Sequence, residues 1–131
     1  MASKAAEGDT IPDLTVTPDR YLPVRYAGAS GDFNPIHIDQ EFAKSVGLPG
    51  AILHGLYMMG LVSKAATDFA GGDPRQLESL SVQFRGMGFP EEEITVTGSV
   101  VSIEGDRAEL DLVATQGDRE VIRNSVATVR V

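Results

Sequence analysis

Residues 26–63 read YAGASGDFNPIHIDQEFAKSVGLPGAILHGLYMMGLVS, and the rest of the chain is arranged around this stretch. Its first part places a carboxylate, Asp32, five residues before an imidazole, His37. Its second part is the only strongly apolar segment of helical length in the protein. We therefore expect a loop with polar chemistry, held against a buried helix by the remainder of the chain.

The spacing between Asp32 and His37 favours a loop over a helix. Two residues five positions apart point in different directions on a helix, because only spacings of three or four share a face. Gly31 permits a tight bend, and Pro35 biases Asn34 away from helical backbone. Such a loop can bring the carboxylate and the imidazole together as a proton acceptor and a proton donor. The structural alternative is that Asp32 bonds only its own turn and His37 caps the next element.

The letters GDFNPIH at residues 31–37, followed by AILHG at residues 51–55, resemble the signature of the MaoC-like (R)-specific enoyl thioester hydratases, also called hydratase 2. The positions that agree with the motif are Gly31, Asp32, Asn34, Pro35, His37 and, at a small position, Ala43. The similarity extends through Ser63 and more weakly over most of the chain. That family has the hot-dog fold, so the resemblance implies an α+β protein whose antiparallel sheet wraps a long central helix.

The resemblance also implies roles for individual residues. Asp32 and His37 would be the catalytic pair, and the backbone N–H of Gly55 would bind the thioester oxygen. In the family a serine two turns along the helix also lines the site, and the lining residues predicted here are Asn34, Tyr57 and Ser63. The implied reaction interconverts trans-2-enoyl and (R)-3-hydroxyacyl thioesters of coenzyme A or acyl carrier protein. Such a lyase needs no metal and no organic cofactor.

The apolar segment predicts a helix over about residues 51–70, buried on every side because it lacks a polar face. Gly55 and Gly60 lower helix propensity, as expected where a sheet or a ligand approaches the backbone. At Gly55 the free N–H groups and the positive end of the helix dipole favour a ligand, whereas at Gly60 close packing on a sheet is equally favoured. His54 is expected to bond a nearby backbone or carboxylate group. For Ser63, a bond to its own helix is the alternative to lining the site.

Before this helix, the expected elements are a strand over residues 11–16, a helix over residues 17–29 and a short helix over residues 40–46. Pro23 lies inside the first helix and predicts a kink or a shortened start. Asp39 is expected to cap the second helix, which ends at Gly47. Residues 1–10 are small and polar and are expected to form a loose lead-in.

After the break at residues 71–74 the pattern changes to a period of two, which is typical of strands with one apolar face. The expected strands cover residues 80–84, 94–97, 108–114 and 121–131. A slip of phase at Val100-Val101 predicts a bulge, and short turns are expected at residues 104–106 and 116–118. Residues 91–93, three glutamates, are interpreted as a solvated turn. The pattern predicts an antiparallel meander whose apolar face wraps the central helix.

Composition excludes several classes of function. The 131 residues predict one domain over residues 1–131, with a core small enough to profit from oligomerisation. A net charge of −8 argues against a nucleic-acid partner. The absence of cysteine excludes disulfides, thiolate ligands and cysteine nucleophiles, and with two histidines no metal site is expected. No signal core or membrane-length segment is present, so we expect a soluble cytoplasmic protein.

Alternatives to a self-sufficient hydratase stay open. The hot-dog scaffold also hosts thioesterases, although the GDFNPIH loop argues against water aimed at a carbonyl. The chain also fits a non-catalytic acyl-binding module, or an active subunit of a heteromeric dehydratase that needs a partner. A homodimer is expected, with a heterodimer or higher oligomer as the alternative. Acyl chain length, the thiol carrier, the pathway and its direction, and the proton handled by each of Asp32 and His37 are not decided by sequence.

Overall fold

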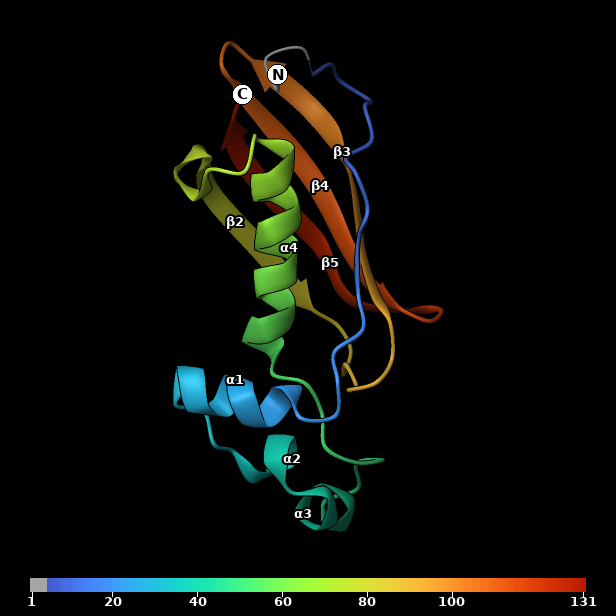
Figure 1. The fold of residues 1–131 in the computed structure, drawn as a ribbon. Helices are drawn as coiled ribbons and strands as arrows, with labels where there is room; N and C mark the ends of the chain where they lie inside the picture. Colours follow the sequence, from blue (N-terminus) through green and yellow to red (C-terminus); the bar gives the residue numbers. More distant parts are fainter. Residues whose placement is uncertain (1–4) are drawn as a thin grey trace.

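The computed structural model describes residues 5–131, so the first four residues of the predicted lead-in lie outside the described part. Within that part, a five-stranded antiparallel sheet curves around one long helix, and short helices gather beyond one end of it (Figure 1). The elements in chain order are β1 (Leu14–Val16), α1 (Leu22–Ser30), α2 (Pro35–Ile38), α3 (Gln40–Ser45), α4 (Gly55–Phe69), the 3₁₀ helix η2 (Pro74–Gln76), β2 (Leu77–Phe84), β3 (Ile94–Glu104), β4 (Arg107–Gln116) and β5 (Arg119–Arg130). The predicted α+β arrangement, a sheet wrapped around a central helix, is confirmed.

The order of strands in the sheet is β1-β3-β4-β5-β2, and all neighbours are antiparallel. β3, β4 and β5 form the predicted meander, with turns at Gly105 and Gly117, whose φ angles are +61° and +65°. A shift of register against β4 between Val100 and Ser102 confirms the predicted bulge.

β2 departs from the prediction, because it pairs with β5 and not with β3. The expected four-strand meander is therefore wrong for this strand. Residues 85–93 form a long connection from the end of β2 to the start of β3, on the far side of β5 and β4. Alternation along a strand tells which side chains face the core, but it does not name the neighbouring strand.

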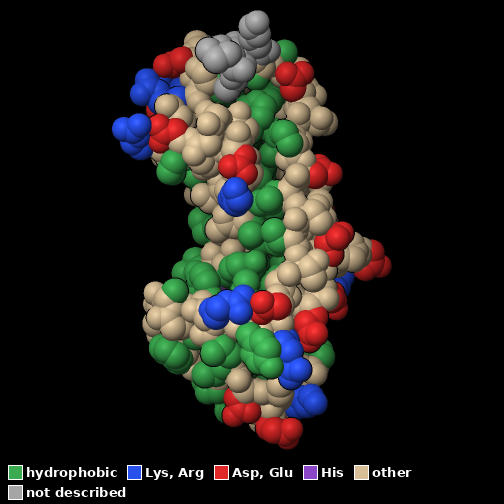
Figure 2. Space-filling view, viewed as in Figure 1, with side chains coloured by type: hydrophobic (Ala, Val, Ile, Leu, Met, Phe, Trp, Pro, Cys, Tyr) green, Lys and Arg blue, Asp and Glu red, His purple; other side chains and the backbone are tan. Residues whose placement is uncertain are grey.

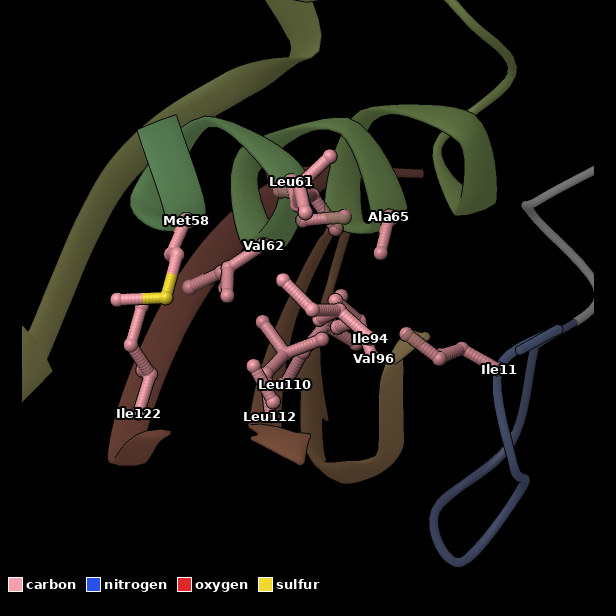
Figure 3. Close-up of a cluster of buried hydrophobic side chains, with 14 of the residues drawn as sticks. Ile11, Met58, Leu61, Val62, Ala65, Ile94, Val96, Leu110, Leu112 and Ile122 are labelled. Atoms are coloured by element: carbon pink, nitrogen blue, oxygen red, sulfur yellow. The ribbon is translucent and has the colours of Figure 1, made fainter. Parts of the chain in front are cut away.

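Helix α4 supplies the core of the fold. Figure 3 shows Met58, Leu61, Val62 and Ala65 of α4 directed toward the strands, and all four are buried. They meet buried residues of the sheet, which include Ile94, Val96, Leu110, Leu112 and Ile122. Burial of these side chains removes apolar surface from water, and this is the main favourable contribution to folding.

Two expectations about this helix are corrected, and one of the two alternatives for Gly60 is excluded. α4 begins at Gly55 and not near residue 51, because His54 has extended backbone and residues 51–54 run outside the helix. The expectation that the helix is buried on every side is wrong for the single chain, because Leu56 is 65% exposed. Nor does a sheet pack on Gly60, where an added Cβ would meet nothing within 4 Å.

The segment between β1 and α4 forms a small helical layer beyond the N-terminal end of α4 (Figure 1). Pro23 lies in the first turn of α1, so the helix starts at Leu22 and the predicted shortened start is confirmed. Asp39 caps α3 as predicted, because its Oδ1 accepts the Phe42 N–H at 3.1 Å. Among residues 5–131, no helix is both long and apolar enough to cross a membrane.

Candidate active site

The GDFNPIH segment folds as a chain of short side-chain to backbone bonds. Gly31 ends α1 with a φ of +81°, a conformation that glycine adopts without strain. The Ser30 hydroxyl then accepts the Asp32 N–H at 3.2 Å, and Asp32 Oδ1 accepts the Asn34 N–H at 3.2 Å. Asn34 in turn caps α2 by accepting the Ile36 N–H at 3.2 Å. Asp32 therefore does bond its own turn, as the structural alternative predicted, and it also faces His37.

Asp32 and His37 are brought to one place by the segment over residues 31–34 and by α2, so the expected loop is corrected at His37, which lies on this short helix. The Asp32 Oδ2 atom lies 3.9 Å from His37 Nε2, and the two side chains are 53% and 9% exposed. His37 Nδ1 lies 2.8 Å from the Ile52 carbonyl oxygen. A carbonyl oxygen only accepts, so Nδ1 carries a proton, and in the neutral tautomer Nε2 is the bare nitrogen that faces the carboxylate. In that tautomer the site offers two proton acceptors that lie 3.9 Å apart.

His54 lies beneath this pair and is 2% exposed. Its Nε2 lies 3.0 Å from the backbone oxygen of Asp32, so the prediction that His54 bonds a backbone group is confirmed. Its ring also stacks on His37, with centroids 3.9 Å apart and planes 20° apart. The Tyr26 ring packs on the His54 ring with centroids 4.7 Å apart. The Tyr57 ring meets the Tyr26 ring edge-on, with centroids 5.8 Å apart. Sequence reasoning missed this aromatic cluster, because no periodicity connects residues 26, 37, 54 and 57.

Gly55, the predicted oxyanion donor, is the first residue of α4 and follows His54 directly. Among the described residues its N–H donates to no partner, as expected at a helix start. An added Cβ at Gly55 would lie 3.2 Å from the ring of Phe84, which is itself half-exposed at the end of β2. Phe84 follows Leu80 and Val82 in the alternation of β2 and covers the start of α4, although it is less buried than a strand residue of the apolar face would be.

The predicted lining residues lie at different distances from this centre. Asn34 lies within the loop, two residues after Asp32. Tyr57 is half-buried in the first turn of α4, and burial raises the pKa of its phenol above the usual 10.0. Ser63 lies eight residues after Gly55, about 12 Å along the helix axis at 1.5 Å per residue. Within residues 5–131 Ser63 forms no side-chain hydrogen bond, so a bond to its own helix is not found.

The arrangement does not suit a metal ion. Ligand atoms of Asp32, His37 and His54 all lie within 4.8 Å of one another. However, the two imidazoles are stacked with nearly parallel planes, so lone pairs that lie in those planes do not converge on one point. Zinc requires nitrogen ligands aimed at the ion from about 2.0–2.1 Å in a tetrahedral set. His54 Nε2 also points at the Asp32 carbonyl oxygen.

A separate cleft of about 300 Å³ is lined by residues that include Arg20, Gln40, Phe89 and Glu91. Neither Asp32 nor His37 contributes to it. The charged side chains among its lining residues are Arg20, Glu91 and Glu92, and no histidine lines it.

Comparison with known protein families decides the relationship. The family model described as "MaoC like domain" matches residues 3–121. The chain belongs to this family. The MaoC-like chain is 35% identical over 123 residues to the enoyl-CoA hydratase ChsH3 of Mycobacterium tuberculosis, covering 90% of this chain and 41% of that one. It is also 35% identical over 113 residues to a fatty acid synthase subunit beta of Aspergillus oryzae, covering 78% and 6%. The chain thus spans less than half the length of these curated relatives.

Solved structures confirm the hot-dog fold expected from the resemblance. A structure described as a MaoC-like dehydratase has a TM-score of 0.92 and 27% identity, covering 98% of this chain and 41% of that chain. An (R)-hydratase of A. caviae involved in PHA biosynthesis has a TM-score of 0.87 and 21% identity, covering 98% of both chains. The ChsH1–ChsH2 complex of Mycobacterium tuberculosis contains a chain with a TM-score of 0.86 and 22% identity, covering 96% and 98%. At these two lower identities the likeness concerns the fold alone.

Proposed function

We propose that this MaoC-like protein interconverts trans-2-enoyl thioesters and (R)-3-hydroxyacyl thioesters. The observation that carries the proposal is the Asp32–His37 pair, a half-exposed carboxylate and a buried imidazole whose bare Nε2 faces it at 3.9 Å. Membership of the MaoC-like family and the likeness to an enoyl-CoA hydratase support this reaction over others. The thiol component is coenzyme A or an acyl carrier protein.

The pair is suited to hold one water molecule. A water oxygen placed about 2.8 Å from each acceptor can donate one hydrogen to Nε2 and one to the carboxylate, because the two atoms are 3.9 Å apart. During hydration the water oxygen forms a bond to the β-carbon, and one of the two groups takes a water proton. The electrons of the double bond move toward the thioester carbonyl, and the group that took the water proton then returns a proton to the α-carbon from the same side, so the pair ends in its starting protonation state. The reverse sequence is the dehydration.

Gly55 is proposed to bind the thioester oxygen. Negative charge builds on this oxygen as the β-carbon is attacked, and a free N–H at a helix start is aimed to stabilise it. Gly55 is joined directly to His54, which touches both members of the pair, so donor and pair lie at one site. Because the thioester itself makes the α-carbon acidic, the reaction needs no metal and no organic cofactor.

Four further residues are proposed to line the substrate. Asn34 lies beside the acid–base pair, and Tyr57 lies in the turn of α4 that follows Gly55. Ser63, about 12 Å further along the axis, is placed to meet only a more distant part of the acyl group. Phe84 covers the helix start, so it would contact the acyl group near the thioester.

We also propose a homodimer as the working form. β2 is an edge strand, so one of its sides has no neighbour in the sheet of residues 5–131. Hydrophobic side chains gather on the face that carries α4 and on the helical layer below it (Figure 2), and Leu56 and Phe84 are among the exposed ones. Pairing of two edges would satisfy the free backbone groups and cover such residues. The ChsH1–ChsH2 complex supports a heteromeric pair as the alternative.

The test follows the conjugated enoyl absorbance of crotonyl-coenzyme A and longer trans-2-enoyl homologues, with a thiol reagent in parallel. Hydration removes the absorbance without releasing thiol. We expect Asp32→Asn and His37→Ala each to lower the rate by about 10²–10⁴-fold while the protein stays folded. Asp39→Asn is the matched control, because asparagine also caps a helix and Asp39 lies outside the pair.

Other outcomes would redirect the proposal. Thiol release with the double bond intact would identify a thioesterase. Near-full activity of folded Asp32→Asn would remove that residue from the catalytic pair. If no homologue reacts, native mass measured with the protein alone would show whether a partner subunit or a carrier-bound substrate is missing.

A further inference from the structure

We propose that His54 is a positioning residue that holds both members of the Asp32–His37 pair in register with the Gly55 N–H. This inference rests on the function proposed above. His54 does not touch the substrate in this scheme. It acts through two contacts, a hydrogen bond to Asp32 and a ring stack on His37.

The hydrogen bond ties the loop to the core. His54 Nε2 donates to the Asp32 backbone oxygen at 3.0 Å, across 22 positions of sequence. The other described bonds of Asp32 are local, to Ser30 and Asn34. Local bonds shape the turn but leave it free to move as a unit, whereas the bond from His54 fixes its distance from α4. His54 is itself anchored, because the Leu53 N–H beside it donates to the Gly88 oxygen at 2.8 Å.

The ring stack fixes the second member of the pair. The Ile52 carbonyl holds one edge of the His37 imidazole through Nδ1. That bond alone permits the ring to tilt about the Nδ1–O direction. The His54 ring, 3.9 Å away and 20° from parallel, restricts this tilt and keeps Nε2 directed at the Asp32 side. Orientation of this kind matters because a misplacement of about 1 Å can cost about 10²-fold in rate.

Core stability does not explain an imidazole at this position. Within the described residues His54 Nδ1 is buried and has no hydrogen-bond partner, an arrangement that disfavours folding. A phenylalanine, although somewhat larger, would stack on the same ring and leave no unpaired nitrogen. The feature that only the histidine supplies is the donor to Asp32, so the residue is best explained by the geometry of the pair.

The contact also sets a register between two halves of the site. His54 and Gly55 are consecutive, so the bond to Asp32 links the loop that carries the acid–base pair to the residue that starts α4. The distance between the proton-transfer groups and the oxyanion donor is then set by one side chain. Loss of that bond should lower kcat, because alignment is needed in the transition state, and change KM little.

The principal variant is His54→Phe, which keeps the stack and removes the donor. We expect kcat to fall by about 10- to 100-fold with KM changed by less than about 3-fold, in a protein that circular dichroism shows to be folded. In an Asp32→Asn background the same change should cost less than about 3-fold, because His54 acts through the pair. The control is Tyr26→Phe, which keeps the ring packed on His54 and should stay within about 2-fold of wild type.

The proposal is wrong if His54→Phe keeps kcat within about 2-fold of wild type, or if its effect multiplies fully with that of Asp32→Asn. A structural arm needs no activity. Nitrogen-15 NMR of the imidazoles should show His54 protonated at Nε2 and His37 at Nδ1, and His54→Phe should speed amide exchange around Asp32 but not in α4. Opposite tautomers or unchanged exchange would overturn the inference. An inactive wild type that passes these tests would refute the proposed function alone.

Discussion

Gln116 supports a sharp prediction of stability, because it is buried at the end of β4 and holds the connection over residues 85–93. Its Oε1 accepts the Phe89 N–H at 2.8 Å, and its Nε2 donates to the Phe89 oxygen at 2.8 Å and to the Glu92 oxygen at 3.1 Å. One amide thus satisfies three backbone groups of the long connection that separates β2 from β3. The perturbation is Gln116→Met, which keeps the length of the side chain and removes these three bonds, together with the one that Oε1 accepts from Nη2 of the partly exposed Arg119 at 3.2 Å.

The expected cost follows from those bonds. A net hydrogen bond contributes about 1 kcal/mol, so three give about 3 kcal/mol. The Glu92 oxygen lies in an exposed residue and can rehydrate, which lowers the sum. Phe89 is half-buried, so its two backbone groups stay unpaired and keep the sum high. We expect the free energy of unfolding to fall by about 2–3 kcal/mol, or about 1–1.5 M in the urea midpoint for a slope of about 2 kcal/mol per molar.

The assay is equilibrium urea unfolding followed by circular dichroism at one fixed protein concentration, since association adds to apparent stability. Gln83→Met is the matched control, because Gln83 is exposed on β2 and bonds only other side chains, Arg85 and Asn124. It should change stability by less than about 0.5 kcal/mol. If Gln116→Met unfolds at the same urea concentration as Gln83→Met, the argument that Gln116 holds the connection is refuted.

Three further predictions concern α4. Gly55→Ala should have a free energy of unfolding within about 1 kcal/mol of wild type, because the half-exposed Phe84 ring can shift. It should hydrate the enoyl substrate at least about 10-fold more slowly, because the added methyl shields the backbone N–H of residue 55. Equal activity in a rate assay would remove Gly55 as the oxyanion donor. Gly60→Ala should raise the unfolding free energy by about 0.5–1 kcal/mol, and a fall would show that this face is covered in solution. Burial raises the pKa of Tyr57 above 10.0. The stability linked to its neutral phenol is therefore present below about pH 10 and is lost as the pH rises through the folded-state pKa. The difference between the absorbance titrations of wild type and Tyr57→Phe should have its midpoint above 10.0, and a midpoint below 10.0 would contradict this.

Local features of the chain could be predicted because their causes are local. The Asp32–His37 loop follows from Gly31 and Pro35, and the cap of α3 follows from Asp39. Alternation of apolar residues predicted the strands, and its slip predicted the bulge after Val100. The motif over residues 31–37 also predicted the family, which the match over residues 3–121 confirms.

Contacts between distant residues depended on the folded chain. The alternation of apolar residues in β2 does not show that this strand pairs with β5, because β3 and β5 both offer alternating apolar residues. Two contacts near the candidate site also join residues far apart in sequence: His54 stacks on His37, and the Phe84 ring lies over Gly55. The exposure of Leu56 likewise depends on which segments pack against α4. The chain's local patterns were enough to predict candidate catalytic residues and most of the local elements. Only the tertiary structure decided how they are oriented, because orientation depends on packing, which sums many long-range contacts that no local pattern contains.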